Sequence, residues 1–296
     1  MFLGIGYLLK VFIHKFNFEV KGGIMSERIR TDGEEILRVK THFKDIDDLL
    51  GGGIPETHTT ILAGNFGTMK TSFALLNAYN QVLYEKKNVL FISLDQSFAA
   101  LQNQLLSLKF NLADISIIRL NKLEDFEKDI NKINVYSDVG CLIIADYNCI
   151  GGVAKQSLDD NEVDDWINII KNLIKKIRVE VHLETVILDS VNYLLKLSSF
   201  KKAFLQLREL KLLTKRNSIN LWFIFESSSL DDFETSEINL LADTNLFIQR
   251  KIYERKIIRE FIILSSRQTN HDIDKYTLVF KEKEFKVLDG GVHPRI

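Results

Sequence analysis

The clearest pattern in the chain is a series of short apolar runs without polar alternation. They lie at residues 61–64, 88–94, 141–145, 185–188 and 221–225. Strands with no polar face are typical of a parallel sheet that is covered on both sides. The pattern therefore predicts a core of parallel strands.

Helical segments separate these runs. Residues 70–84 read as a helix, helical sequence follows the second run as far as Leu108, and residues 162–178 and 200–216 are amphipathic. The segment 162–178 begins with acidic and ends with basic residues, which suits the helix dipole. The alternation of strand and helix predicts a doubly wound α/β sheet with helices on its faces.

The pattern changes after about residue 225. Residues 245–252 and 256–264 read as paired strands, and residues 276–280 and 285–288 read as a last hairpin around the charged turn 281–284. We therefore expect a C-terminal antiparallel β extension on a mostly parallel sheet, within one domain.

The first residues carry a different signal. Residues 1–13 are apolar but broken by Lys10, and they fall below the ~20 residues of a membrane helix. They also lack the small-residue cleavage site of a signal peptide. Codons for Gly22 and Gly23, just before Met25, can form a ribosome-binding sequence. We expect Met25 to be the native start, residues 1–24 to be a non-native or disordered extension, and residues 25–296 to form a single domain. The alternative is an amphipathic arm that packs on the domain or on a neighbour.

The composition limits the classes of binding partner to be expected. The net charge is −1 over 296 residues, so no global field attracts nucleic acid or a membrane surface. The two cysteines, Cys141 and Cys149, have neither a metal-ligand spacing nor the number of a disulfide framework. We interpret them as reduced core thiols and expect a cytoplasmic protein without a membrane partner.

The strongest candidate for chemistry lies between the first apolar run and the first helix. It fits the phosphate-binding pattern G-x-x-x-x-G-K-[ST], the P-loop or Walker A motif, at every position but one, and Ser72 follows it in the helix. Backbone N–H groups of such a turn point inward, and the helix N-terminus adds partial positive charge. Lys70 is expected to neutralise the β and γ phosphates of ATP, and the Thr71 hydroxyl to bind Mg²⁺. The motif reads Gly64-Asn65-Phe66-Gly67-Thr68-Met69-Lys70-Thr71.

Met69 stands where this type of loop usually has glycine. If the position needs a positive φ, a side chain there costs roughly 1–2 kcal/mol. If it does not, Met69 points away from the phosphates at little cost. The alternative to a phosphate loop is a Gly-containing turn with a surface lysine, but the strand before the motif and the helix after it are the context that the motif requires.

A nucleotide site of this kind also needs a carboxylate at the end of a neighbouring strand, to hold the water shell of Mg²⁺. Two runs end in that way, at Asp189 and at Asp146. We favour Asp189, because Ser190 beside it can hydrogen-bond near the phosphates. In either position the aspartate could instead cap the following turn.

These motifs resemble the KaiC/RadA group of RecA-superfamily ATPases. Residues 46–55 (IDDLLGGGIP) match the L-D-x-L-L-G-G-G-I-P motif of that group almost letter for letter, nine residues before Gly64. Residues 187–190 resemble its Walker B segment, and Ala242-Asp243 resembles the L-A-D before its β ribbon. Arg267 and His271 resemble the end of its K-x-R-x-x-x-H motif. The resemblance runs from about Arg38 to Leu288 and implies a RecA-like fold with ATP and Mg²⁺.

The chain also departs from that group. Asp95 and Gln96 align with its paired catalytic glutamates, and Ser265 aligns with the lysine of K-x-R. The resemblance implies that Asp95 orients the attacking water and that Arg267 reaches across a subunit interface to a neighbour's γ-phosphate. It thus implies a homo-oligomer, a ring or a dimer, with weakened hydrolytic machinery. Glu226, at the end of the fifth run, is an alternative base.

Three functions follow as hypotheses. The first is a slow ATPase acting in regulation or signalling, with nucleotide at subunit interfaces. The second is a non-enzymatic module that binds ATP and changes its assembly or its contacts with a protein partner that the sequence does not identify. A DNA recombination or repair mediator is not favoured, because residues 227–241 hold Asp231, Asp232, Glu234 and Glu237 but no basic residue, whereas phosphate contacts need positive charge.

Overall fold

The computed structural model describes residues 36–120, 129, 133, 139–149, 162–253 and 256–289. The predicted extension 1–24 and the predicted start at Met25 lie outside the described residues, so both stay predictions.

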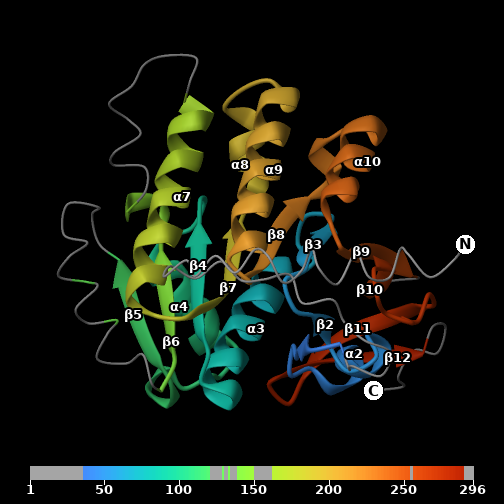
Figure 1. Ribbon diagram of the computed structural model, residues 1–296. Coiled ribbons are helices and arrows are strands. Elements are labelled where there is room, and N and C mark those ends of the chain that lie inside the picture. Colours follow the sequence, from blue (N-terminus) through green and yellow to red (C-terminus); the bar gives the residue numbers. More distant parts are fainter. Residues whose placement is uncertain are drawn as a thin grey trace, which may run out of the picture. The chain divides into compact units, whose positions relative to one another are not determined.

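The helices and strands alternate through most of the described chain (Figure 1). The helices are α2 (Lys44–Leu49), α3 (Lys70–Glu85), α4 (Phe98–Ser107), α7 (Glu162–Glu180), α8 (Val191–Lys196), α9 (Phe200–Arg216) and α10 (Asp232–Leu241), with short 3-10 helices η1 (Leu112–Asp114) and η3 (Ser227–Ser229). The strands are β1 (Arg38–Val39), β2 (Ile54–Pro55), β3 (Thr59–Gly64), β4 (Asn88–Ser93), β5 (Ser116–Leu120), β6 (Cys141–Ala145), β7 (Leu183–Asp189), β8 (Asn220–Glu226), β9 (Thr244–Tyr253), β10 (Lys256–Ser266), β11 (Lys275–Lys281) and β12 (Glu284–Asp289).

Ten strands form one sheet in the order β12-β11-β10-β9-β3-β8-β7-β4-β6-β5, and β1 pairs with β2 apart from it. The strands from β9 to β5 run parallel, and β10, β11 and β12 continue the sheet antiparallel to their neighbours. The predicted α/β class, with a mostly parallel sheet and a C-terminal antiparallel extension, is confirmed. Two features were not predicted: β5 at the far edge, and the parallel pairing of β9 with β3.

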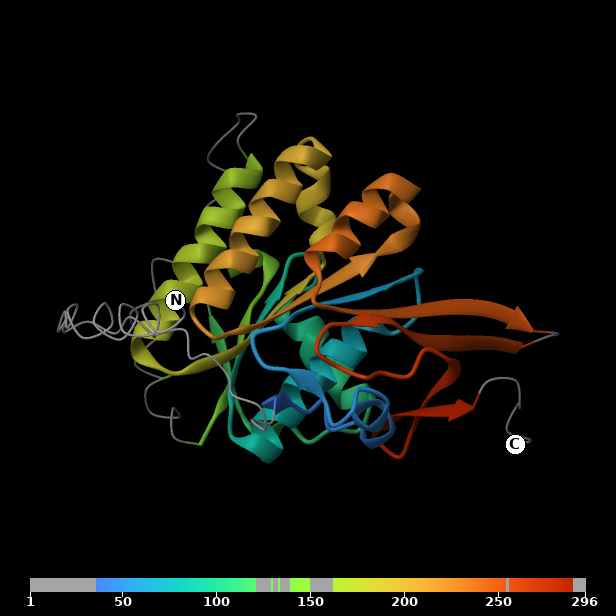
Figure 2. The same ribbon diagram turned by 45° about the vertical axis from the view of Figure 1, so that its right-hand side comes forward.

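The sheet is buried on both faces, which explains the apolar runs. Along β3, Ile61 and Ala63 belong to the core under α7, α8, α9 and α10. Leu62, between them, belongs to the core on the other face, under α2, α3 and α4. Figure 2 shows the long helices above the sheet and α3 below it. Because successive side chains of a strand point to opposite faces, a strand between two helical layers must be apolar at every position.

Both cysteines are free and buried, as predicted for core thiols. Burial raises the pKa of each thiol to about 12, and neighbouring carboxylates add to that rise. None of the helices among the described residues has the length and apolar content needed to cross a membrane.

The register of the parallel strands decides which loops meet. Gly64 at the end of β3 lies opposite Glu226 at the end of β8, and Ser93 at the end of β4 lies opposite Asp189 at the end of β7. The segments that follow these residues therefore gather at one edge of the sheet, where α/β folds commonly bind ligands.

Candidate functional site

A cavity of about 430 Å³ lies at this edge of the sheet. Its lining comes from the loop before α3, from the segment after β4 and from the ends of β7 and β8. The predicted residues that line it are Phe66, Gly67, Thr68, Met69, Lys70, Thr71, Asp95, Gln96 and Asp189.

The loop from Gly64 to Met69 has the backbone that the motif requires. A Cβ added at Gly64 would lie 1.9 Å from the carbonyl oxygen of Ile248 on β9, so that only glycine fits. Gly67 has φ 75°, in the left-handed region that glycine adopts without cost. The tight turn thus depends on both glycines. Gly64 is needed because the backbone of Ile248 lies so close, and Gly67 is needed because of its positive φ.

Met69 is the residue that caps α3, and it adopts φ 70° and ψ 27°. Of the two alternatives left open by the sequence, the structure shows the strained one, which costs a non-glycine residue about 1–2 kcal/mol. The Met69 side chain is partly buried and packs against the core under α3. Burial of this side chain offsets part of the backbone cost.

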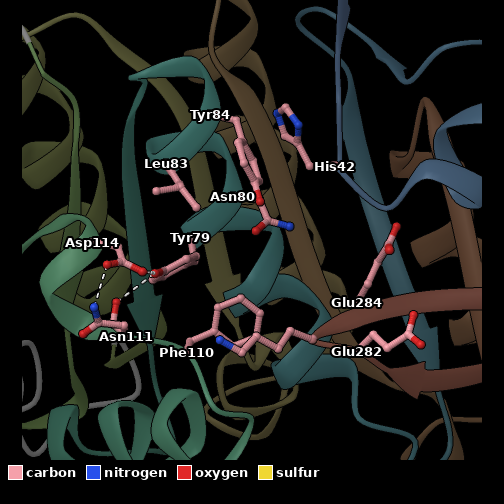
Figure 3. Close-up of a pocket in the computed structure, with 11 residues that line it drawn as sticks. His42, Tyr79, Asn80, Leu83, Tyr84, Phe110, Asn111, Asp114, Glu282 and Glu284 are labelled. Carbon is pink, nitrogen blue, oxygen red and sulfur yellow. Dashed lines mark hydrogen bonds between the residues drawn. The ribbon is translucent and has the colours of Figure 1, made fainter.

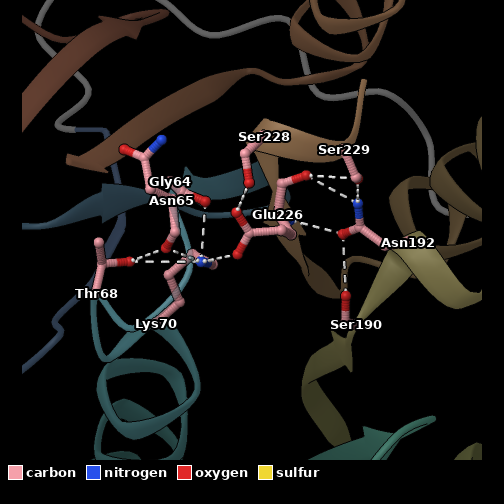
Figure 4. A network of polar contacts seen from close by, with 9 residues as sticks. All are labelled: Gly64, Asn65, Thr68, Lys70, Ser190, Asn192, Glu226, Ser228 and Ser229. Atoms are coloured by element: carbon pink, nitrogen blue, oxygen red, sulfur yellow. Dashed lines mark hydrogen bonds and ion pairs between the residues drawn. The ribbon is translucent and has the colours of Figure 1, made fainter. Parts of the chain in front are cut away.

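Lys70 is directed back into the loop (Figure 4). Its Nζ donates to the carbonyl oxygens of Gly64 at 2.9 Å and Asn65 at 2.8 Å. It also forms an ion pair with Glu226, with 3.0 Å between Nζ and Oε2. Lys70 and Glu226 are 10% and 23% exposed, so the pair is only partly screened by water. The ammonium group thus lies inside the curve of the loop, where a bound phosphate would meet it.

Glu226 is held at its place by Asn192, in the first turn of α8. The Asn192 side-chain amide donates to the Glu226 carbonyl oxygen at 2.9 Å, and its oxygen accepts from the Glu226 N–H at 2.6 Å. The Ser228 hydroxyl donates to Glu226 Oε1 at 2.5 Å. This network, drawn in Figure 4, places a carboxylate beside Lys70. The sequence indicated Glu226 only as an alternative base and did not indicate Asn192.

Asp189, at the end of β7, is 1% exposed. Its carboxylate lies near Thr71 and Asp95, while its Oδ2 atom is buried without a partner among the described residues. Burial, and then the neighbouring Asp95 carboxylate, raise the pKa of Asp189 to about 7, although Thr71 and Lys70 favour the ionised form. Burial also raises the pKa of Asp95. Two carboxylates crowded beside an unpartnered oxygen fit a site for a cation.

The raised pKa predicts a pH-dependent stability. A carboxyl with a higher pKa in the folded chain contributes stability that is fully present below its ordinary value of 3.8 and is lost as the pH rises through about 7. Asn does not titrate, so the stability of Asp189→Asn relative to the parent should rise by roughly 2–3 kcal/mol from pH 5 to pH 8, at about 1.4 kcal/mol per pKa unit. Urea unfolding of both proteins at the two pH values, without nucleotide or Mg²⁺, measures this change.

Asp48→Asn, at an exposed position of α2, is the matched control for replacing an aspartate away from the cavity. A relative stability of Asp189→Asn that stays constant between pH 5 and pH 8 would show that Asp189 ionises normally.

Asp146, the other aspartate considered from the sequence, lies outside the cavity. Its carboxylate accepts hydrogen bonds from the N–H groups of Phe98 at 2.9 Å and Cys149 at 3.0 Å. Arg119 pairs with it at 3.4 Å. This aspartate therefore has the capping role that was the structural alternative for both positions.

Three further residues of the predicted loop do not line the cavity. The carbonyl oxygens of Gly64 and Asn65 accept hydrogen bonds from Lys70, which does line the cavity. The Ser72 hydroxyl lies inside α3 and accepts from the Gln104 amide at 2.6 Å. Ser72 therefore holds the side-chain amide of Gln104, a residue that lines the cavity.

Arg267 and His271 are not brought to this cavity. Ser266 pairs with Thr244 at the start of β9, and Thr244 pairs with Thr60 at the start of β3, the edge opposite Gly64. There the Arg267 guanidinium lies 3.1 Å from Asp243 and is 63% exposed. Within one subunit Arg267 cannot meet a phosphate at the loop, so its predicted role requires a second copy of the chain.

Asp243 links several segments at the sheet edge opposite Gly64. Burial alone would raise its pKa, but the backbone N–H of Thr59 and the ammonium of Lys211 hold the pKa below its ordinary value. The Thr59 N–H donates to Asp243 Oδ2 at 3.1 Å, and Lys211 Nζ lies 3.2 Å from Oδ1. The L-A-D segment of the resemblance is thus a structural clamp between β3, α9 and the start of β9.

Arg250 is a cation beside the loop that the sequence did not indicate. A Cβ added at Gly67 would lie 3.3 Å from Arg250 Nη1, which places this exposed arginine of β9 against the phosphate loop. Arg250 pairs in register with Arg259 of β10, and like charges directly opposite each other are unfavourable in a sheet. The Arg250–Arg259 pair follows from the register of β9 and β10. The sequence alone does not give that register and therefore did not indicate Arg250.

The acidic stretch at residues 227–241 has a local structural role. It forms η3 and α10, and Asp231 with Glu234 makes a capping box in which each side chain bonds the other residue's backbone N–H. The acidic first turn suits the helix dipole. Asp231 and Glu234 therefore have a local structural role at the start of α10.

Comparisons with known proteins agree with this geometry. A sequence model described as "ATPase: KaiC" matches residues 39–291. The circadian clock oscillator protein KaiC of Thermosynechococcus vestitus is 30% identical over 81 residues, which is 27% of this chain and 16% of that protein. A UPF0273 protein of Aeropyrum pernix is 23% identical over 263 residues, which is 86% of this chain and 92% of that protein.

A UPF0273 protein of Saccharolobus solfataricus is 27% identical over 176 residues, which is 58% of this chain and 55% of that protein. The match thus spans only a small part of the clock protein and about half of the Saccharolobus protein. A solved structure, the KaiC-like protein of Pyrococcus horikoshii, has the same fold, with a TM-score of 0.61 at 19% identity over 86% of this chain and 100% of that one.

Proposed function

The chain belongs to the KaiC ATPase family, and from this premise we propose that it binds ATP with Mg²⁺ in the cavity between β3 and β7. One observation carries the proposal: the ammonium of Lys70, the curve of the loop and the carboxylate of Asp189 all converge on this one cavity. Its volume of about 430 Å³ lies in the range of small-molecule sites.

Each residue around the cavity has a role in this proposal. The loop N–H groups and Lys70 hold the phosphates. Thr71 and Asp189 hold the metal and its water shell, and the unpartnered Oδ2 of Asp189 fits that role, because a buried acceptor without a donor is unfavourable. Bound Mg²⁺ supplies charge neutralisation for the phosphoryl group. Arg250, against Gly67, adds positive charge on the same side.

Binding requires one rearrangement. Lys70 is paired with Glu226, and ATP brings negative charge to the place where that carboxylate lies. Phosphates must therefore compete with Glu226 for the ammonium group. We infer that Glu226 lowers ATP affinity, and that Asn192, which fixes its backbone, sustains this competition.

We propose slow hydrolysis as the activity. Asp95 and Gln96 line the cavity, so a carboxylate is available to orient a water, but from a shorter side chain than glutamate. Gln96 lacks a basic group. The presence of Asp95 and Gln96 in place of two glutamates also favours the second candidate function. This is a module in regulation or signalling that binds ATP without hydrolysing it.

Two measurements test the proposal. The melting temperature of the full chain should rise with ATP and Mg²⁺, and less with ATP and a chelator. Phosphate release then separates a slow ATPase from a module that only binds. If ATP leaves the melting temperature unchanged at millimolar concentration, the proposed site is wrong.

We further propose that the chain assembles with nucleotide at subunit interfaces. Arg267→Ala should weaken ATP-dependent assembly tenfold or more, as buried interface arginines often do. The subunit should stay folded, because Asp243 keeps its bonds to Thr59 and Lys211. Sedimentation velocity with and without ATP measures both.

Arg208→Ala, on an exposed position of α9, is the matched control and should assemble like the parent. A parent that remains monomeric at high concentration with ATP would exclude the trans role of Arg267, whatever the variant does.

A further inference from the structure

A second cavity, of about 500 Å³, lies away from the phosphate loop. It is bounded by the second half of α3, by the segment between α4 and η1 and by the turn between β11 and β12 (Figure 3). It shares no lining residue with the cavity at the end of β3. A ligand bound in this cavity would therefore be distinct from a nucleotide bound at the end of β3.

Aromatic rings form two of its walls. Tyr79 and Phe110 meet edge to face with 5.0 Å between ring centroids, and His42 lies 5.0 Å from Tyr84. Tyr84 is 63% exposed, so its ring is accessible to a ligand. Faces of Tyr and Phe rings attract cations, and several rings around one space form the sites that bind organic ammonium groups.

Asn80 lies between these rings and the β11–β12 turn (Figure 3). The residue is only 6% exposed. Its amide nitrogen donates to the Thr41 carbonyl at 3.5 Å, and its side-chain oxygen is a further acceptor on the wall of the cavity. Asn80 can therefore accept a hydrogen bond from a ligand that carries N–H groups.

Carboxylates complete the lining. Glu282 pairs with Lys286 at 2.7 Å, and Glu284 accepts the Lys44 N–H at 3.1 Å. Asp114 accepts from the Asn111 amide and from the Tyr79 hydroxyl. A carboxylate has about four acceptor sites, so each keeps free capacity. Lys283 also lines the cavity and Lys286 neutralises Glu282, so Glu284 and Asp114 leave a small excess of negative charge.

We propose that this cavity binds an organic cation, an ammonium or guanidinium group on an apolar stem. The rings hold the stem and face the charge, Asn80 accepts an N–H, and Glu284 and Asp114 balance the charge. Either an arginine or lysine side chain of a partner protein or a free amine presents this group. An anionic ligand is disfavoured by the same carboxylates.

The test uses the full chain and agmatine, a guanidinium on a short alkyl stem, in isothermal titration. Binding is expected with Kd on the order of 1 mM or tighter. Tyr84→Ala and Glu284→Gln should each weaken it about fivefold, because one removes a ring and the other a charge. Phe233→Ala and Glu237→Gln on α10 are the matched controls and should bind like the parent.

Two comparisons decide the chemistry. N-butylurea, similar in shape but uncharged, should bind at least tenfold more weakly than agmatine. Equal binding of the urea, or unchanged agmatine affinity in both Tyr84→Ala and Glu284→Gln, would overturn the proposal. Loss of agmatine binding in Glu226→Gln, which removes a carboxylate of the nucleotide cavity, would place the cation at that cavity and would also overturn the proposal.

The source of the cation is decided by a third ligand. An amidated Gly-Arg-Gly peptide that binds more tightly than agmatine and spermidine supports a partner's side chain as the occupant. The reverse order supports a free amine. Both results support the cation site itself.

Discussion

Lys70→Ala is expected to abolish the ATP-dependent rise in melting temperature and to weaken ATP binding about 100-fold or more. The ammonium lies 2.8–2.9 Å from two carbonyl oxygens of the loop and 3.0 Å from Glu226. Its loss removes the charge that faces the phosphates and leaves the Glu226 carboxylate to repel them. Truncating one member of a buried charge pair costs about 2–5 kcal/mol, and 100-fold corresponds to about 2.7 kcal/mol.

Two further proteins are compared with Lys70→Ala. Lys201→Ala, at an exposed position of α9, is the matched control and should respond to ATP like the parent. Lys70→Ala combined with Glu226→Gln should bind ATP more tightly than Lys70→Ala alone, because the repelling charge is gone. A Lys70→Ala protein that ATP stabilises as much as the parent would show that nucleotide binds elsewhere.

Asp95→Glu combined with Gln96→Glu is expected to raise ATP turnover about 10- to 100-fold at similar ATP affinity. Asp95 lies beside Asp189 in the cavity, but its carboxylate is one methylene short of a glutamate, about 1–1.5 Å, and about 1 Å of misplacement can cost on the order of 100-fold. The parent should turn over far below the ~1–100 s⁻¹ of phosphoryl-transfer kinases. Phosphate release under saturating ATP and Mg²⁺ measures this rate.

Ser265→Lys should raise turnover further, but only where subunits assemble. Position 265 lies at the sheet edge opposite the loop, so a lysine there reaches a phosphate only on a second copy. Loss of such a cation can cost roughly 1000-fold, although effects on one transition state need not add. Asp48→Glu on α2 is the control for a lengthened carboxylate and should leave the rate unchanged.

A different base would show itself in two single variants. Glu226 lies 3.0 Å from Lys70, close enough to the phosphates to be considered as the general base. Brisk hydrolysis by the parent that survives Asp95→Asn and is lost in Glu226→Gln would assign the reaction to Glu226. Slow hydrolysis that is lost in Asp95→Asn supports the assignment made here.

The phosphate loop was predictable from sequence because its signals are local. An apolar strand, glycines at a tight turn and a helix beginning at Lys70 lie within one short segment, and each is a property of neighbouring residues. The apolar runs of the central strands were equally readable, because burial on both faces removes polar residues from every position. The paired strands at the C-terminal end followed from the same kind of local pattern.

Other features depended on contacts between distant segments. The Lys70–Glu226 pair joins residues 156 positions apart, and Asn192 acts on Glu226 from a third segment. The left-handed backbone of Met69 is imposed by the closure of the loop, since its side chain alone would favour another conformation. No spacing in the sequence indicates such partners.

The sequence by itself thus determined the family and the sheet class, and predicted a phosphate-binding turn at residues 64–71, because periodicity and short motifs report on each residue's immediate neighbours. Only the tertiary structure decided that Asp189 rather than Asp146 faces the cavity, that Arg267 lies at the opposite edge, and that Arg250 meets the loop. Strand order and register set these relations. Register is the sum of many weak side-chain contacts across the sheet, and it exists only in the folded chain.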